Sequence, residues 1–261
     1  PYIKKVGSPE VIVDGILDDW NFCFPVDFNQ DVMTPNMRPV VDGWVQTDDE
    51  NCSGTIYQMY DDDNFYFAAK IVDDAPGHFS DAVWAADCIE YYMANWDIGK
   101  DKIVPAEETI GFKDDAVTHE YAFQLNMALS VGLDSVRIYG YYGPGGKEGE
   151  GGTGVIEGAE GAYTLTDDGY ILEGKIPWTS LASKVTGNEF ELPPGGRIPC
   201  MWSLYDVDES ELAADFKGYC YTKTGYAGWM GVSPGWQYID VKGLDFIDYL
   251  EEYWTGVEEP G

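Results

Sequence analysis

The feature that most limits the fold of this chain is a repeated pattern of short apolar and aromatic runs, each bounded by Gly, Pro, Asn or Asp. Such runs extend from EVIVD at residue 10 to WQYIDV at residue 236 of the 261 residues. Short runs rich in β-branched and aromatic side chains between turn residues are typical of strands. We therefore expect an all-β fold, an antiparallel and jelly-roll-like β-sandwich, over residues 1–245.

The clearest predicted hairpin is AYTLTDDGYILEGKIPW, residues 162–178. Asp167, Asp168 and Gly169 supply the turn between two runs whose side chains alternate between faces. One face of the second run is apolar and carries Tyr170, Leu172 and Ile176. The opposite face carries Ile171, Glu173 and Lys175, so we expect part of it to meet solvent.

Three segments depart from the strand pattern. Residues 143–161 are rich in Gly and predict a long loop inserted between strands. Pro177 fits the first turn of a short helix in PWTSLASKV. Residues 246–261 predict a C-terminal helix and tail, whose apolar stripe contains Phe246 or Ile247, Leu250, Tyr253 and Trp254. That stripe would dock on the chain's own sandwich or on a neighbouring molecule, as in a homo-oligomer.

Charge excludes one class of partner. The chain has 47 Asp and Glu against 15 Lys and Arg, a formal net charge of −32. Nucleic acids are bound through clustered basic side chains, so they are excluded as natural partners, and anionic membrane surfaces are disfavoured. No apolar run approaches the roughly 20 residues that cross a bilayer, so membrane insertion is not expected. The acidity favours an exported protein, extracellular or at the cell surface, although it could serve solubility alone.

The chain begins at Pro1 without Met, so we expect a processed or trimmed chain. Its five cysteines lack the CxxC and His spacing of zinc sites. In an exported protein, Cys200 could bridge to Cys220 and Cys23 to Cys52, with Cys88 left as a buried thiol. Five buried thiols in a reduced protein are the alternative.

Recognisable catalytic sequences are missing. The two histidines, His78 and His119, do not stand near a plausible nucleophile, and GxSxG, HExxH and P-loop sequences are absent. A glycosidase built on two carboxylates is a possibility on paper only, because any acidic β-protein supplies many Asp and Glu. We therefore expect a protein that is not an enzyme.

The aromatic content indicates a function more specifically than the many carboxylates do. Nine Trp and 19 Tyr stand among short strands and turns. Sugar rings stack on aromatic planes while their hydroxyls bond to carboxylates and amides. Trp84 precedes DCIEYY, on which Glu90 lies, and Trp229 stands in a Gly-rich turn. These side chains are candidates for sugar binding. For Trp20, Trp178 and Trp202 we favour packing in the core.

The order of several segments resembles family 9 carbohydrate-binding modules and their relatives. These segments are VDGILDDW, NFYFAAKIVDD, VWAADCIEYYMAN, GYILEGKIPWTSL and a Trp-containing turn before the last strand, and the resemblance runs from about Glu10 to Val241. It implies a β-sandwich that binds calcium and holds a sugar, often the reducing end of a glycan, between two Trp rings.

By position, Trp84 and Trp229 would be the two rings and Glu90 the carboxylate that accepts hydrogen bonds from hydroxyls. Trp236 competes with Trp229 for the second ring. This chain departs from the best-known sugar binders in having Gln124 in place of an Arg and Ser203 in place of a Gln. Each loss removes hydrogen bonds that fix a polar ligand.

Aspartates gather in turns where they could hold structural Ca²⁺. In VDGILDDW, Asp14 and Asp18 would help fix the loop while Trp20 pins it to the core. Calcium takes six to eight oxygen ligands, and neighbouring turns could add Asp61, Asp73 and Asp74. None of these clusters is an EF-hand, and Asp is also a common turn former.

Three functions fit the sequence. The first is a non-catalytic, calcium-stabilised extracellular module that binds a glycan or oligosaccharide. The second is a structural subunit of a fibre, surface layer or matrix that reuses the sandwich without binding sugar. The third, haem binding as in other relatives of this fold, has no assignable pattern among the seven Met.

Overall fold

The computed structural model describes residues 2–7, 11–20, 25–29, 49–77, 87–94, 103–106, 109–112, 122–130, 135–140, 154–181, 197–206, 219–222 and 237–242. Within these ranges the chain is almost entirely β-structure, as the turn-bounded runs predict. The strands before residue 115 are β1 (Tyr2–Lys5), β2 (Val26–Phe28), β3 (Cys52–Tyr60), β4 (Asn64–Asp73), β5 (Cys88–Ala94), β6 (Ile103–Ala106) and β7 (Thr109–Phe112). Those that follow are β8 (Ala122–Ser130), β9 (Ser135–Gly140), β10 (Gly154–Val155), β11 (Glu160–Thr166), β12 (Gly169–Pro177), β13 (Arg197–Asp206), β14 (Tyr219–Thr222) and β15 (Gln237–Lys242).

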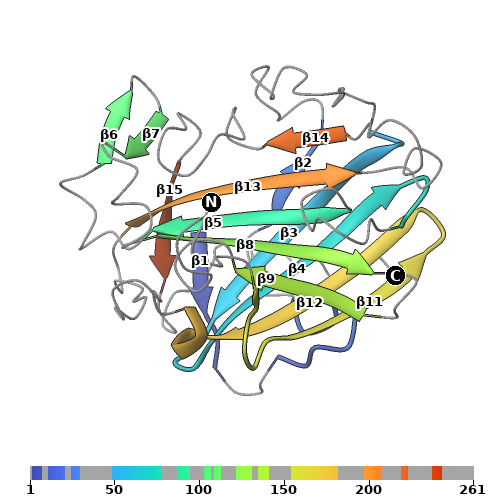
Figure 1. The fold of residues 1–261 in the computed structure, drawn as a ribbon, viewed down its shortest axis with the longest axis horizontal. Coiled ribbons are helices and arrows are strands. Elements are labelled where there is room, and N and C mark those ends of the chain that lie inside the picture. The colour runs from blue at the N-terminus through green and yellow to red at the C-terminus, as the bar shows by residue number, and fades with distance from the viewer. Residues whose placement is uncertain are drawn as a thin grey trace, which may run out of the picture.

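The main sheet folds back on itself to form two layers. Its strand order is β10-β9-β8-β5-β13-β15-β1-β3-β4-β12-β11, with β14 beside β13 and β2 beside β3. All of these pairings are antiparallel except those of β1, which runs parallel to β15 and β3. In Figure 1 the layer of β5, β8 and β9 overlies the layer of β3, β4 and β12. We call them the β5 layer and the β4 layer.

The main core lies between these two layers. The β4 layer contributes Phe65, Phe67 and Leu172, and the β5 layer contributes Tyr91 and Leu125, all at most 1% exposed. Trp202 of β13 is also fully buried there and packs edge-on against Tyr91. Burial of so much aromatic and aliphatic surface on inward-facing positions is the main force that holds a sandwich together.

A second, smaller cluster covers the outer face of the β4 layer. Met59, Tyr66 and Ala68 point away from the main core and pack against Val11 and Trp20. Residues 11–20 therefore form a covering segment over this layer. Part of the outer face of the β4 layer is consequently shielded, although Lys70 on the same face is exposed. Antiparallel sheets commonly leave one whole face to solvent.

The predicted hairpin is confirmed in detail. Thr166 pairs with Gly169 across the turn at Asp167 and Asp168, and Gly169 has a positive φ of 147°. Tyr170, Leu172 and Ile176 are buried in the main core. Part of the opposite face meets solvent as expected, because Ile171 and Lys175 are only half-buried. Glu173 on that face is fully buried, because the covering segment lies over it.

The predicted loop, helices and buried Trp side chains agree with the structure to different degrees. The Gly-rich segment contains the short strand β10 and the first two residues of β11, so its C-terminal part is a short turn between two strands rather than a continuous loop. Pro177 ends β12, and the described part of the expected helix is one turn of 3₁₀-helix, η4 (Trp178–Leu181). Trp20 and Trp202 are buried as predicted, and Trp178 is partly buried against the core. The C-terminal helix at 246–261 lies outside the described residues. No helix in the described part of the chain could span a bilayer.

Candidate functional site

The covering segment is anchored by one buried carboxylate, that of Glu173 on β12. Its Oε2 accepts hydrogen bonds from the backbone N–H groups of Asp14 (3.0 Å), Gly15 and Ile16 (3.1 Å). Its Oε1 accepts a hydrogen bond from Trp20 Nε1. Three consecutive N–H groups converge because Gly15 has a φ of 82°, a conformation that costs a glycine little.

Burial raises the pKa of Glu173, and the nearby charge of Asp19 raises it further. Hydrogen bonds from Trp20, Gly15 and Asp14 act in the opposite direction and only partly compensate. All the donors that surround this carboxylate come from the chain itself. Glu173 is therefore a structural anchor of the covering segment.

The aspartates of the same turn organise its backbone. Asp14 Oδ1 accepts a hydrogen bond from Ile16 N at 3.0 Å, and Asp19 Oδ2 accepts one from Ile12 N at 2.7 Å. Asp14 and Asp18 are exposed. A tight turn rich in Asp thus forms because two of its carboxylates cap local N–H groups while Glu173 and Trp20 fasten it to β12.

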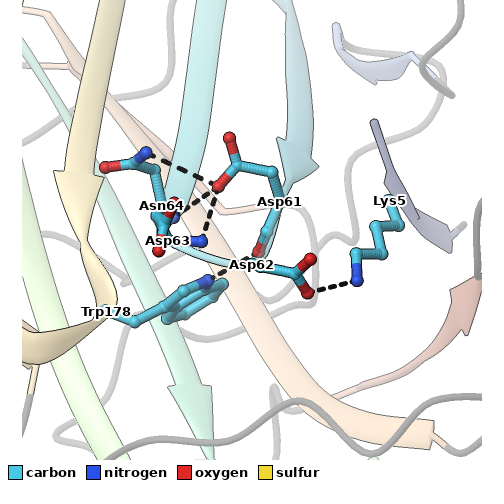
Figure 2. Close-up of polar contacts among 6 residues, drawn as sticks. All are labelled: Lys5, Asp61, Asp62, Asp63, Asn64 and Trp178. Carbon is cyan, nitrogen blue, oxygen red and sulfur yellow. Dashed lines mark hydrogen bonds and ion pairs between the residues drawn. The ribbon is translucent and has the colours of Figure 1, made fainter. Parts of the chain in front are cut away.

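Asp61, another predicted calcium ligand, occupies the turn between β3 and β4 shown in Figure 2. Its Oδ1 accepts hydrogen bonds from the backbone of Asp63 (2.8 Å) and Asn64 (2.6 Å), and its Oδ2 accepts one from the hydroxyl of Tyr66 (2.7 Å). The indole of Trp178 donates to the Asp61 carbonyl at 3.1 Å. Both carboxylate oxygens of Asp61 therefore serve the turn.

Asp73 and Asp74 lie at the far end of β4. Asp73 is buried and its Oδ1 accepts a hydrogen bond from Ala75 N at 2.8 Å. Asp74 Oδ1 accepts one from Asn51 Nδ2 at 2.6 Å. Among the described residues, no three His, Cys, Asp or Glu side chains are arranged to hold a metal ion. Calcium stays a prediction, which these residues do not by themselves support.

The outer face of the β5 layer carries a different buried carboxylate. Glu90 of β5 is 4% exposed and points away from the main core, because its neighbours Ile89 and Tyr91 point into it. Asn126, its cross-strand partner on β8, is fully buried and donates from Nδ2 to Glu90 Oε1 at 2.8 Å. We call this the Glu90–Asn126 pair.

The other predicted sugar ligands are placed only in part. Gln124 pairs with Tyr92, and Ser203 pairs with Glu90. By strand alternation these two backbone positions share the outer face with the Glu90–Asn126 pair. Trp84, Trp229 and Trp236 lie outside the described residues, so their roles stay predictions.

Sequence reasoning missed Asn126 as a partner of Glu90. The available signal was the alternation in AFQLNMALS, where Gln124 and Asn126 stand two residues apart between apolar neighbours. A polar residue at alternate positions of an otherwise apolar strand marks the face that does not enter the core.

The predicted disulfide between Cys200 and Cys220 does not fit the strand register. Cys220 pairs with Tyr205, while Cys200 pairs with Met93 and Gln237. The two cysteines are thus offset by five positions along β13, about 16 Å at the usual rise per residue. A disulfide spans at most about 7 Å between Cα atoms. Cys52 and Cys88 are buried, and Cys23 lies outside the described residues, so a link from Cys23 to Cys52 stays a prediction.

The described part of the chain is thus a two-layer β-sandwich that buries a hydrogen-bonded carboxylate and amide on the outer face of one layer. The model of the family described as "Carbohydrate family 9 binding domain-like" matches residues 29–194, more than half of the chain. The chain belongs to this family.

Solved structures agree on the fold. One similar structure is a family 9 carbohydrate-binding module from Caldicellulosiruptor kristjanssonii in complex with cellotriose, with 14% identity, complete coverage of both chains and a TM-score of 0.55. Another, from the same organism in complex with glucose, shows 15% identity over 94% of this chain and 99% of that chain, with a TM-score of 0.50. No curated protein matches the chain.

Proposed function

We propose that this chain is a non-catalytic carbohydrate-binding module whose sugar rests on the outer face of the β5 layer. The observation that carries the proposal is the Glu90–Asn126 pair, a carboxylate and an amide buried on the face opposite the core. Asn126 donates a hydrogen bond to Glu90 Oε1 and so helps to orient the carboxylate. A carboxylate held this way accepts strongly from sugar hydroxyls, since hydrogen bonds to an ionised acceptor are the stronger ones.

The first ligand class to test is glucose and its β-linked oligomers, because two modules of similar fold have glucose and cellotriose bound. Gln124 would add an amide on the same face. Trp84 and either Trp229 or Trp236 would supply rings for stacking, as the resemblance to family 9 modules implies. A glycan ligand and the strong acidity of the chain both favour a role outside the cell.

The described make-up of this face supports a role in binding without catalysis. Glycoside hydrolysis uses two carboxyl groups about 5 to 9.5 Å apart. The described register positions around Glu90 on the outer face are Cys88, Tyr92, Gln124, Asn126, Ala128, Met201, Ser203 and Tyr205. None of these is a second carboxylic acid. Glu90 is therefore proposed to bind rather than to transfer protons.

The test is a calorimetric titration of the chain with glucose, cellobiose and cellotriose. Glu90→Gln keeps the size of the side chain and removes its charge, so affinity should fall about 10- to 100-fold. Glu160→Gln is the matched control, because Glu160 lies on the edge of the β4 layer with a side chain 63% exposed. The Glu160→Gln variant should bind these sugars with the same affinity as the unmodified chain.

Equal affinity of the Glu90→Gln and unmodified chains would reject the site. If no sugar binds and the chain elutes as a large species, the alternative of a structural subunit gains support. The calcium prediction is tested separately with a chelator. Bound calcium stabilises the folded state by mass action, so its removal should lower Tm. An unchanged Tm would count against structural calcium.

A further inference from the structure

Two large apolar side chains project into solvent from the covering segment. Ile12 is 65% exposed and Ile16 is 52% exposed, and we call these two side chains the Ile12–Ile16 patch. In the described part of the chain, Leu165 is the other large apolar side chain that is exposed, at 50%. Leu165 is paired with Tyr170, which points into the main core, so it belongs to the opposite face of the β4 layer.

The Ile12–Ile16 patch is held on a fixed backbone. Ile16 N–H donates to Glu173 Oε2 at 3.1 Å and to Asp14 Oδ1 at 3.0 Å. Ile12 N–H donates to Asp19 Oδ2 at 2.7 Å. Because the backbone is already ordered, a partner that docks on the two isoleucines loses little conformational entropy in this segment. The patch is thus prepared for an apolar contact.

Strand β15 brings the chain close to this patch. Lys242, the last residue of β15, is paired with Lys4 of β1, and Lys4 is paired with Met59 of β3. Figure 1 shows β15 and β1 side by side. With neighbouring strands about 4.8 Å apart, Lys242 lies about 10 Å from Met59. Met59 packs in the outer cluster with Val11, the residue before Ile12. The chain therefore leaves β15 near the N-terminal end of the covering segment.

The sequence after β15 has the length and the chemistry to cover the patch. Four residue steps lead from Lys242 to Phe246, and they reach about 13 Å. Residues 246–254, outside the described part of the chain, predict a helix about 13 Å long with one apolar stripe. Ile12 and Ile16 are also four steps apart, so their Cα atoms are separated by at most about 13 Å. One helix of this length can contact both side chains.

Charge determines how such a contact is held. The charged residues between positions 245 and 252 are all acidic, and Asp14 and Asp18 of the covering segment are exposed. Like charges would therefore surround the contact. Its stability must come from burial of apolar surface, and added salt should strengthen it by screening the repulsion.

We propose that the apolar stripe of residues 246–254 docks on the Ile12–Ile16 patch of the same chain and extends the cover of the β4 layer. The chain's own segment is favoured over a second copy for two reasons. A tethered segment has an effective concentration of about millimolar, and the net charge of −32 opposes self-association. The patch lies on the layer opposite the proposed sugar site, so this inference does not depend on the proposed function.

The experiment measures hydrogen–deuterium exchange of the whole chain by mass spectrometry. Docking should slow exchange in the peptide of residues 246–254, and the double variant Ile12→Ser/Ile16→Ser should speed it about tenfold. Leu165→Ser is the matched control, because it removes an apolar side chain of similar exposure from the other face. In this control the peptide should exchange as slowly as in the unmodified chain.

Two further measurements complete the test. Ile12→Leu/Ile16→Leu keeps the patch apolar and should retain slow exchange in residues 246–254. Peptides from β4 and β12 should exchange equally in every variant, which shows that the sandwich is folded.

Three results would overturn the proposal. The first is fast exchange of residues 246–254 in the unmodified chain. The second is slow exchange that persists in Ile12→Ser/Ile16→Ser. The third is slow exchange that appears only as protein concentration rises, together with a dimer in sedimentation, because the stripe then docks on a second copy.

Discussion

The two layers of this sandwich each bury a glutamate on their outer face, and the two carboxylates have different surroundings. Glu173 of the β4 layer receives three backbone N–H groups and one indole N–H from residues 14–20. Glu90 of the β5 layer is paired with an amide from the neighbouring strand and lies within a row of polar positions. Burial of a carboxylate therefore does not by itself identify a binding site.

The largest effect on stability is expected at Glu173, which accepts four hydrogen bonds from the covering segment. Glu173→Ala leaves several buried N–H groups without an acceptor, and each costs about 1 to 3 kcal/mol. We expect a loss of about 3 to 5 kcal/mol in the free energy of unfolding, measured in urea. Glu160→Ala, which removes an exposed ion pair with Lys175, should cost less than about 1 kcal/mol. Similar losses in both variants would contradict the anchoring role.

Gly15 tests whether the covering segment requires its tight turn. A Cβ there would lie 2.8 Å from Thr164 Oγ1 and 2.9 Å from the carbonyl carbon of Tyr163, in addition to the positive φ. Gly15→Ala should destabilise the fold by about 2 to 3 kcal/mol. Gly158 also has a positive φ, but its Cβ would meet only Pro177, at 3.2 Å and beyond. Gly158→Ala should therefore cost about 1 kcal/mol, and equal costs at the two positions would contradict this difference.

Substitutions of Asn126 test whether the Glu90–Asn126 pair contributes to sugar binding. Asn126→Ala removes the donor that orients Glu90, so affinity for glucose should fall about tenfold. Asn126→Asp keeps the shape but replaces the amide donor by a second carboxyl group beside Glu90, so it should weaken binding at least as much as Asn126→Ala. Unchanged affinity in both variants would show that the pair does not act on the ligand. Gly158→Ala provides a control with an intact β5 layer.

The smallest expected effect concerns pH and Glu173. Because its pKa is raised in the folded chain, the protonated form is relatively favoured by folding. Its contribution to stability is complete below the unfolded pKa and is lost as pH rises through the raised folded pKa. In a comparison with Glu173→Gln, which does not titrate, the stability of the unmodified chain should fall more as pH rises from 4 to 7. Parallel curves would indicate a normal pKa.

Local sequence predicts much of this fold. Asp167, Asp168 and Gly169 specify their turn, and alternation assigns Leu172 and Ile176 to the core. Glu90 was selected by its place after Trp84 and by resemblance, whereas its partner Asn126 was not. The reason is that the two residues are 36 positions apart and meet only through strand register.

The sequence by itself determined the strands, their turns and the face that enters the core, because these follow from periods of two residues and from turn chemistry. Tertiary structure alone decided which outer face was covered. Residues 11–20 reach Glu173 across a separation of more than 150 positions and close one face of the β4 layer. It also aligned Ser203, Glu90, Asn126 and Tyr139 into one row. Contacts this distant along the chain depend on strand order and register, which no local pattern encodes.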